Sequence, residues 1–135
     1  MHKILVTGDR NWQDYTTIAA AFVEVLVEWD TSTYDILLIH GAAKGADSLA
    51  GMIGQLWGMQ VDSNPAHWRH TDECPPDCQE MVGKPAGVIR NQKMLDKHPD
   101  IRLALVFHSD LSKSKGTKDM VRRLEKHNIP YRHFK

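Results

Sequence analysis

A regular alternation of short apolar runs with longer segments of helical periodicity constrains this fold more than any other feature. Near-continuous apolar runs, as expected of strands covered on both faces, occupy residues 4–6, 36–39 and 103–107. Weaker strands are expected at 59–62 and 131–134. Segments with apolar residues at helical spacing separate these runs and lie around 18–29, 49–57, 88–95 and 121–124. This order predicts an α/β fold, a Rossmann-like three-layer sandwich with a mainly parallel five-stranded sheet.

The chain has 135 residues, and one domain over 1–135 is the expected organisation. Residues 66–86 lack periodicity and exceed the usual length of a connection, so this long loop is expected to be functional or mobile. The first residues run straight into "KILVTG", and no apolar stretch approaches the length of a membrane span. A cytoplasmic location without a membrane partner is therefore expected, and in that compartment no disulfide is expected between Cys74 and Cys78.

Each notable polar motif follows one of the predicted strands. In chain order these motifs are "TGDRNW", "HGAAKGAD", "NPAHWRH" and "HSDLSKSKGTKD". A polar turn at any one of these places is ordinary, but the carboxyl ends of parallel strands share one edge of the sheet, where ligands of such folds bind. Their coincidence predicts a single ligand site at this edge, and Gly8 gives the ligand close access at the first strand.

The stretch "GAAKGADSLA" has two interpretations. In one, Gly41 and Gly45 form a tight turn between a strand and a helix, and Asp47 caps the helix that begins at Ala46. In the other, the backbone amides and Lys44 receive a phosphate while Asp47 binds a sugar or a base. The spacing matches neither the dinucleotide-binding glycine motif nor the P-loop.

Five blocks in this order resemble the YspA-like branch of the SLOG superfamily, which also includes the LOG nucleotide phosphoribohydrolases and the DNA-processing protein DprA. The blocks are "TGDR", "HGAAKGADSLA", "PAHW", "KPAGVIRNQKML" and "KGTKDMVRR", and together they extend over nearly the whole chain. The resemblance implies a Rossmann-like fold that binds nucleotides or nucleotide-derived ligands. It also implies that the glycine turn after the second strand, and Gly116 with Thr117, contact phosphate or sugar.

Whether the site catalyses a reaction is a separate question. LOG-type enzymes resemble this chain at Arg90 and at Gly116-Thr117, and their pattern ends in a glutamate that supports cleavage of the N-glycosidic bond. Met120 stands at that last position here, with Asp119 one residue earlier. Because methionine cannot stabilise an oxocarbenium-like transition state, a hydrolase would need Arg90 together with Asp119 or Asp47 as its catalytic residues.

Several further side chains have a ligand-binding and a structural interpretation. Arg90 suits bidentate binding of phosphate, or it bridges to a carboxylate and holds the long loop. Asn91 binds a base edge or ties down the loop, and Arg10 binds phosphate or makes a surface ion pair. Thr117 caps the last helix, binds phosphate, or does both.

The tryptophans divide in a similar way. Trp12 and Trp68 lie beside edge motifs, where an indole stacks on a base or packs on the core. Trp29 and Trp57 have helical spacing and apolar neighbours, which favours the core.

A second chemistry is suggested by "HWRHTDECPPDC". His67, His70, Cys74 and Cys78 form a nitrogen and sulfur set that suits a structural, tetrahedral zinc ion. The alternative is that His67 and Trp68 line the ligand site and that the cysteines are free thiols. Apart from this structural zinc ion, no cofactor is expected.

Seventeen basic and seventeen acidic residues give a formal net charge of zero, which disfavours a nucleic acid as partner. The leading hypothesis is a binder that senses or sequesters a nucleotide, and a LOG-type N-glycosidic hydrolase of nucleoside monophosphates is the alternative. A DprA-like binder of single-stranded DNA is the third class, supported by local cations at Lys113, Lys115, Lys118, Arg122 and Arg123. A homo-oligomer is an expectation from the resemblance alone.

Overall fold

Strands and helices alternate along the chain as the sequence predicts. The computed structural model describes residues 1–68 and 85–135. The strands are β1 (His2–Gly8), β2 (Ile36–His40), β3 (Gln60–Ser63), β4 (Leu103–Phe107) and β5 (Tyr131–Phe134). The helices are α1 (Tyr15–Glu28), α2 (Ala46–Leu56), α3 (Ala86–Lys97) and α4 (Gly116–Lys126). Short 3-10 turns occur at Thr33–Asp35 and Leu111–Lys113.

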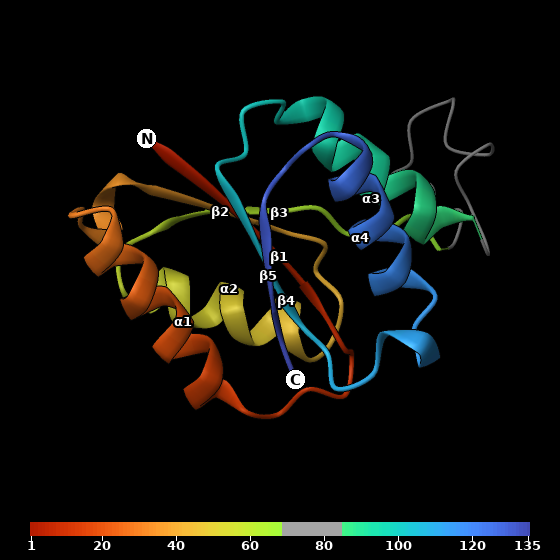
Figure 1. Cartoon of the computed structure of the whole chain (residues 1–135), viewed down its shortest axis with the longest axis horizontal. Helices are drawn as coiled ribbons and strands as arrows, with labels where there is room; N and C mark the ends of the chain where they lie inside the picture. The colour runs from red at the N-terminus through yellow and green to blue at the C-terminus, as the bar shows by residue number, and fades with distance from the viewer. Residues whose placement is uncertain (69–84) are drawn as a thin grey trace.

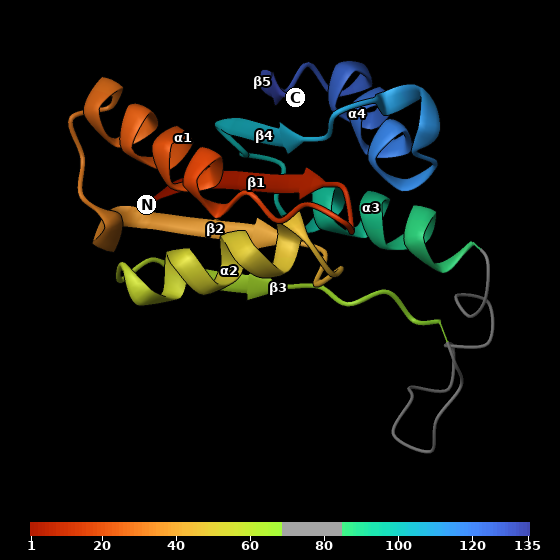
Figure 2. The ribbon, with the colours of Figure 1, turned by 90° about the horizontal axis from the view of Figure 1, so that it is seen from below.

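All strand pairings in this sheet are parallel, in the order β3-β2-β1-β4-β5. Figure 2 shows this order from one edge strand to the other. Helices α1 and α2 cover one face and α3 and α4 the other (Figure 1). The predicted Rossmann-like three-layer sandwich is therefore confirmed, with a sheet that is entirely parallel over the described strands.

The continuous apolar runs are explained by burial on both faces of the sheet. Ile4 and Val6 of β1 pack with α1 and α2, where Phe22 and Phe107 belong to the same buried cluster. Leu5, the residue between them, packs on the other face in a separate cluster. The members of this second cluster come mainly from α3, α4 and the central strands, and include Ile39, Met94, Ala104, Met120 and Leu124. Because successive strand residues point to opposite faces, both clusters require apolar side chains at every position.

Element boundaries differ slightly from the expectation. Helix α3 begins at Ala86, which the sequence pattern placed at the end of the irregular stretch, and β3 ends at Ser63, one residue later than expected. Trp29 and Trp57 pack against the core only partly buried. Over the described ranges, no helix is long and apolar enough to cross a membrane.

The strand order sets the place of the site. The chain leaves β1 toward α1 on one face and leaves β4 toward α4 on the other. The two loops therefore diverge at the carboxyl ends of these neighbouring strands, which is the switch point where open α/β sheets bind ligands.

Candidate functional site

The loop after β1 packs directly on β4 and on the start of α2. The Asp9 amide donates to the Phe107 carbonyl at 2.8 Å, and the Ala46 amide donates to the Asp9 carbonyl at 3.1 Å. A Cβ atom on Gly8 would collide with the Phe107 carbonyl oxygen and lie 2.7 Å from the Ala46 Cβ. Glycine is required at this position because three backbone segments meet there.

Glycine is required at position 45 for a similar structural reason. Its φ of 80° favours glycine, and a Cβ would lie 2.5 Å from the Arg10 carbonyl carbon. The amides of Ala46 and Ser48, in the first turn of α2, already donate to Asp9 and Ala43 carbonyls. The tight-turn interpretation thus accounts for the small residues, and these two amides are occupied by the chain itself.

Asp47 organises the turn from inside. The residue is 5% exposed, and its carboxylate accepts a hydrogen bond from the Gly41 amide at 2.9 Å. Burial raises the pKa of Asp47 to about 6, although the Arg90 guanidinium and the backbone donors of Gly41 and Ala43 oppose this shift. The carboxylate therefore shapes the turn after β2, whereas α2 has Gly45 at its N-cap and no side-chain capping bond, so Asp47 does not cap the helix as one interpretation predicted.

Arg90 connects α3 to this turn. Its Nη1 donates to the Gly41 carbonyl and, at 3.4 Å, to the Asn64 carbonyl, and its Nε donates to Asn91 Oδ1 at 3.0 Å. Within residues 1–68 and 85–135, Nη2 makes no protein hydrogen bond. Burial lowers the pKa of Arg90, the Asp47 carboxylate opposes this effect, and the positive charge of Arg10 adds to it.

Arg10 is the second cation at this edge. Its side chain is exposed and has no ion pair with any described residue. An exposed arginine without an ion-pair partner among the described residues favours an anionic ligand at this edge.

A cavity of about 370 Å³ opens beside Arg10. Its lining comes from the β1–α1 loop and the start of α2, and comprises Arg10, Asn11, Trp12, Gln13, Gly45, Ser48 and Leu49. The Trp12 indole donates to the Asp14 carbonyl at 2.8 Å, and its ring packs 5.8 Å from the Phe107 ring. Core packing therefore holds Trp12 in place at the wall of the cavity.

Asn91 joins the starts of α3 and α4. It is 3% exposed, and its Nδ2 donates to the Gly116 carbonyl at 3.2 Å and to Asp119 Oδ2 at 3.0 Å. The same Asp119 oxygen accepts from Arg123 Nε at 2.9 Å. Polar contacts thus run continuously from Gly41 through Arg90 and Asn91 to the first turn of α4.

Three further residues at the start of α4 differ in how exposed they are. Thr117 is 4% exposed, and its amide donates to Ser114 Oγ at 3.0 Å. A Cβ on Gly116 would meet no atom within 4 Å, so this residue faces open space. Met120 is fully buried in the core.

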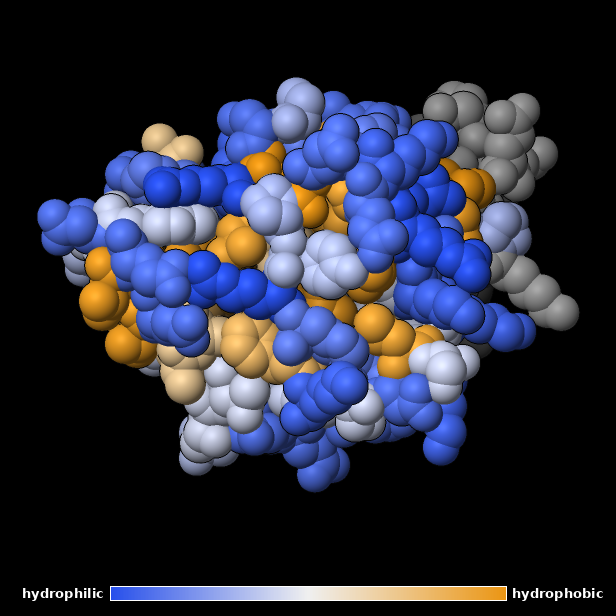
Figure 3. Space-filling model, in the orientation of Figure 1, coloured by the Kyte–Doolittle hydropathy of each residue, from blue (hydrophilic) through white to orange (hydrophobic). Residues whose placement is uncertain are grey.

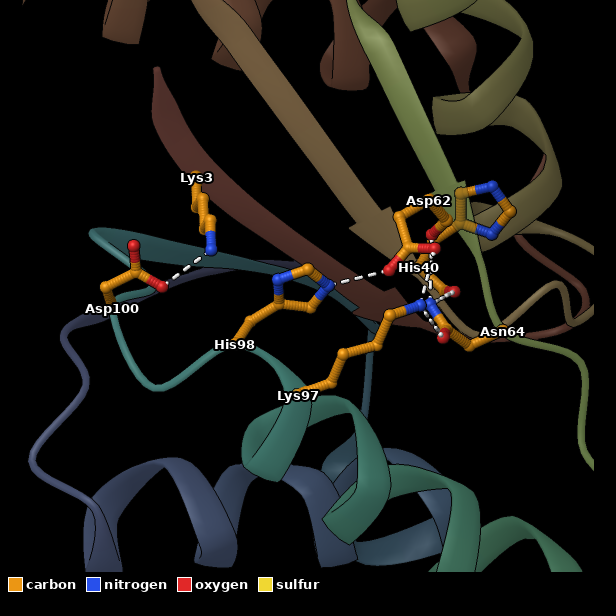
Figure 4. A network of polar contacts seen from close by, with 7 residues as sticks. All are labelled: Lys3, His40, Asp62, Asn64, Lys97, His98 and Asp100. Carbon is orange, nitrogen blue, oxygen red and sulfur yellow. Dashed lines mark hydrogen bonds and ion pairs between the residues drawn. The ribbon is translucent and has the colours of Figure 1, made fainter.

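Asp62 fixes the far side of the site. Figure 4 shows its carboxylate between His98, at 2.6 Å, and Lys97, at 3.0 Å. Although burial would raise the pKa of Asp62, hydrogen bonds from His98, Lys97 and Asn64 lower it. The Asn64 side chain also donates to the Asp62 and His40 carbonyls, so the segment that supplies a carbonyl to Arg90 is held by α3 and β2.

Two histidines at the edge were not among the predicted site residues. His40 is the last residue of β2 and His108 follows the last residue of β4, and the Nδ1 of each accepts the backbone amide two residues later, Ala42 at 2.9 Å and Asp110 at 3.0 Å. Burial lowers the pKa of His40, an effect that Arg90 increases and Asp62 opposes. His108 Nε2 lies 3.9 Å from Asp9 Oδ2, across the switch point. The available signal was their place as the polar residues that terminate buried strands.

The long loop is described only at its ends. Trp68 is 49% exposed, and its ring would lie 3.1 Å from a Cβ on Gly87. His67 lines a second cavity of about 270 Å³ together with Arg90. His70, Cys74 and Cys78 lie outside the described residues, so structural zinc stays a prediction.

The structure brings most of the predicted site residues to one edge of the sheet. Arg10, Gly45 and Gly8 meet on one side, Gly41, Asp47 and Arg90 lie in the middle, and Asn91, Gly116 and Asp119 follow on the other side. Lys44 is exposed beside them. The two cavities are separate: Arg10 and Gly45 line the first, Arg90 the second, and Thr117 neither.

Comparisons with known proteins agree with this architecture. The family model of the YspA, cpYpsA-related SLOG family matches residues 2–70. The Gene 61 protein of Mycobacterium phage D29 is 34% identical over 134 residues, covering 99% of this chain and 97% of that protein. The chain belongs to the YspA, cpYpsA-related SLOG family. The X-ray structure of DNA processing protein A (DprA) from Streptococcus pneumoniae superposes on this SLOG chain with a TM-score of 0.64 and 15% identity, covering 98% of the chain and 50% of DprA. The SLOG chain thus spans half of the DprA chain and shares its fold.

Proposed function

We propose that this SLOG protein binds a nucleotide or a nucleotide-derived small molecule at the carboxyl ends of its strands. Membership of the SLOG family and the DprA-like fold support a nucleotide- or nucleic-acid-related role. The observation that carries the specific proposal is Arg10, an exposed cation that lines a cavity at this edge and makes no ion pair with any described residue. The ligand's phosphate neutralises the Arg10 guanidinium.

The nucleoside occupies the cavity beside Arg10. Its volume of about 370 Å³ lies within the range of small-molecule sites. Trp12 offers an indole surface, and the exposed amides of Asn11 and Gln13 each provide both donors and acceptors. This combination suits a heterocyclic base attached to a phosphate held at the mouth.

The contacts of the carboxylates favour binding over hydrolysis. Asp119 already accepts hydrogen bonds from Asn91 and Arg123, and Asp47 is buried behind the turn that it shapes. Met120, at the position of the glutamate in LOG-type enzymes, is in the core. Stabilising an oxocarbenium-like transition state needs a carboxylate that reaches the ligand. The proposed role is therefore that of a sensor or a sequestering protein.

Titration calorimetry with nucleoside 5′-monophosphates and the corresponding nucleosides tests the proposal. We expect the phosphate to improve affinity by at least about tenfold, because a charge-assisted bidentate contact contributes about 1.5–3 kcal/mol. Arg10→Ala should abolish this preference. Arg122→Ala, which removes an exposed arginine on α4, should leave mononucleotide affinity unchanged.

The same samples test for turnover by chromatography of the bases. Equal affinity for nucleotides and nucleosides in the wild type would contradict the phosphate anchor. Release of free base that is lost in Asp119→Asn would replace the binding role with the LOG-type hydrolase.

A further inference from the structure

Exposed cations lie along one side of α4. Lys115, Lys118, Arg122 and Lys126 follow one another at intervals of three or four residues, which places them on one stripe of the helix surface. All four are exposed, and the stripe extends about 16 Å at 1.5 Å per residue. Figure 3 shows strongly hydrophilic side chains over this helix. We call these four residues the α4 stripe.

The charges of the α4 stripe are not used inside the described part of the protein. None of its members forms an ion pair with residues 1–68 or 85–135, whereas Arg123 on the neighbouring side is bonded to Asp119. The other acidic residue of α4, Glu125, accepts the Tyr131 hydroxyl at 2.8 Å. Holding four like charges together costs free energy, which an external polyanion would recover.

We infer that the α4 stripe binds the backbone of a single-stranded nucleic acid whose terminal nucleotide enters the proposed edge site. The inference rests on the proposed function. Lys115 lies next to Gly116, whose carbonyl accepts Asn91 Nδ2 at the start of α4, so the stripe begins at the carboxyl edge of the sheet and leads away from it. About five phosphates of a stacked strand, spaced 3.4 Å apart, fit along its length.

The side chains of α4 select among polyanions. Its exposed residues include no apolar side chain, so the helix has nothing to insert into a lipid surface. The stripe also carries no aromatic side chain, so contact is with phosphates and is independent of base sequence. A duplex keeps its terminal base paired, whereas a single strand can place that base in the edge site.

Fluorescence anisotropy with a labelled, 5′-phosphorylated oligothymidylate of about twelve nucleotides tests this inference. The variant Lys118→Gln/Arg122→Gln/Lys126→Gln removes three charges and keeps good helix formers. Its control is Val23→Glu/Val27→Glu/Leu56→Glu, which lowers the net charge equally at exposed positions on the opposite helices. Four phosphate contacts predict about a 50-fold loss of wild-type affinity between 50 and 200 mM salt, and one remaining contact predicts about threefold.

The expected result is that only the stripe variant loses oligonucleotide affinity and salt dependence, while its affinity for a mononucleotide equals that of the wild type. Equal oligonucleotide affinity in the wild type and the stripe variant would overturn the inference and leave the proposed function intact. A wild type that binds the oligonucleotide through the stripe but no mononucleotide would overturn the proposed function instead. If duplex displaces the labelled strand at a lower concentration than single strand does, the stripe binds duplex instead. If the stripe variant loses affinity only for anionic vesicles, the stripe binds a lipid surface instead.

Discussion

At the scale of single residues, Asp47 shows how the site and the stability of the fold oppose each other. The carboxylate is buried, its pKa is raised to about 6 from 3.8, and it holds the Gly41 amide. Because the folded protein binds this proton more tightly than the unfolded chain, stability falls as the pH rises through this window, and the full cost is present above pH 6.

Replacing Asp47 by Asn should remove that pH dependence. The amide oxygen of Asn still accepts the Gly41 amide, and nothing titrates. We expect the difference in unfolding free energy, Asp47→Asn minus wild type, to become more favourable by about 2–3 kcal/mol between pH 4 and pH 8, since one pKa unit corresponds to about 1.4 kcal/mol. Urea denaturation across this range measures it. A difference that stays constant with pH would contradict the raised pKa.

Substitutions at Gly8 and Gly116 form a matched pair of stability tests. Gly8→Ala should destabilise the protein by about 3 kcal/mol, because the added methyl group meets the Phe107 carbonyl and the Ala46 side chain. Gly116→Ala should change stability by less than about 1 kcal/mol, because the methyl group enters open space at the start of a helix. Thermal or urea denaturation of both variants checks this prediction. If Gly116→Ala instead weakens nucleotide binding at unchanged stability, Gly116 contacts the ligand as the sequence predicts.

At the scale of elements, the contact between α3 and α4 depends on the buried side-chain amide of Asn91. Asn91 bonds Arg90, the Gly116 carbonyl and Asp119, so its loss leaves several polar groups without partners. Asn91→Ala should lower the free energy of unfolding by about 2–3 kcal/mol. Gln92→Ala, which removes bonds to Asp96 and Arg123 at a less buried position, should cost less than about 1 kcal/mol. Similar losses for both variants would show that Asn91 has no special part in joining the helices.

The elements themselves were predictable, because each depends on a local pattern. Residues 103–107 and 131–134 read as strands and form strands over the same bounds, and α2 begins at Ala46 as expected. The edge at which the site residues gather follows from parallel topology alone. Local patterns determine these features because burial on both faces of a strand leaves a continuous apolar run.

The internal contacts of the site were not predictable to the same degree. Gly45 is small because it packs on Arg10, which is 35 positions away in the chain, and that contact has no local signal. The sequence left open whether Asp47 points toward a ligand or into its own turn. It accepts the amide of Gly41, whose carbonyl is bonded to Arg90 from a third element. The contact of His108 with Asp9 likewise cannot be predicted without knowing that β4 lies beside β1.

At the scale of the whole molecule, a formal net charge of zero conceals a separation of charge between the two helical layers. Helices α1 and α2 contain no lysine or arginine, and their charged residues are Glu24, Glu28 and Asp47. Helices α3 and α4 hold seven cations, Arg90, Lys93, Lys97, Lys118, Arg122, Arg123 and Lys126, against three carboxylates. The net charge of zero disfavours a polyanionic partner, whereas the excess of cations on α3 and α4 favours one.

Retention on a heparin column at pH 8 measures this separation. Although this pH is above the sequence pI of about 7.1, we expect the wild type to be retained and to elute with salt. The triple stripe variant should pass through the column, and the matched α1/α2 variant should still be retained. Loss of retention in both variants alike would mean that bulk charge, rather than the α4 stripe, controls adsorption.

The excess of cations on α3 and α4, set against α1 and α2 where Glu24 and Glu28 are paired with Arg132, makes the charge of the described helices asymmetric across the sheet. In the field of a nearby polyanion such a body experiences a torque before contact, so diffusion delivers it with α3 and α4 facing forward. Encounter rates would then slow as electrolyte is added even though the net charge is zero, and collisions with α1 and α2 in front would be the rarer kind.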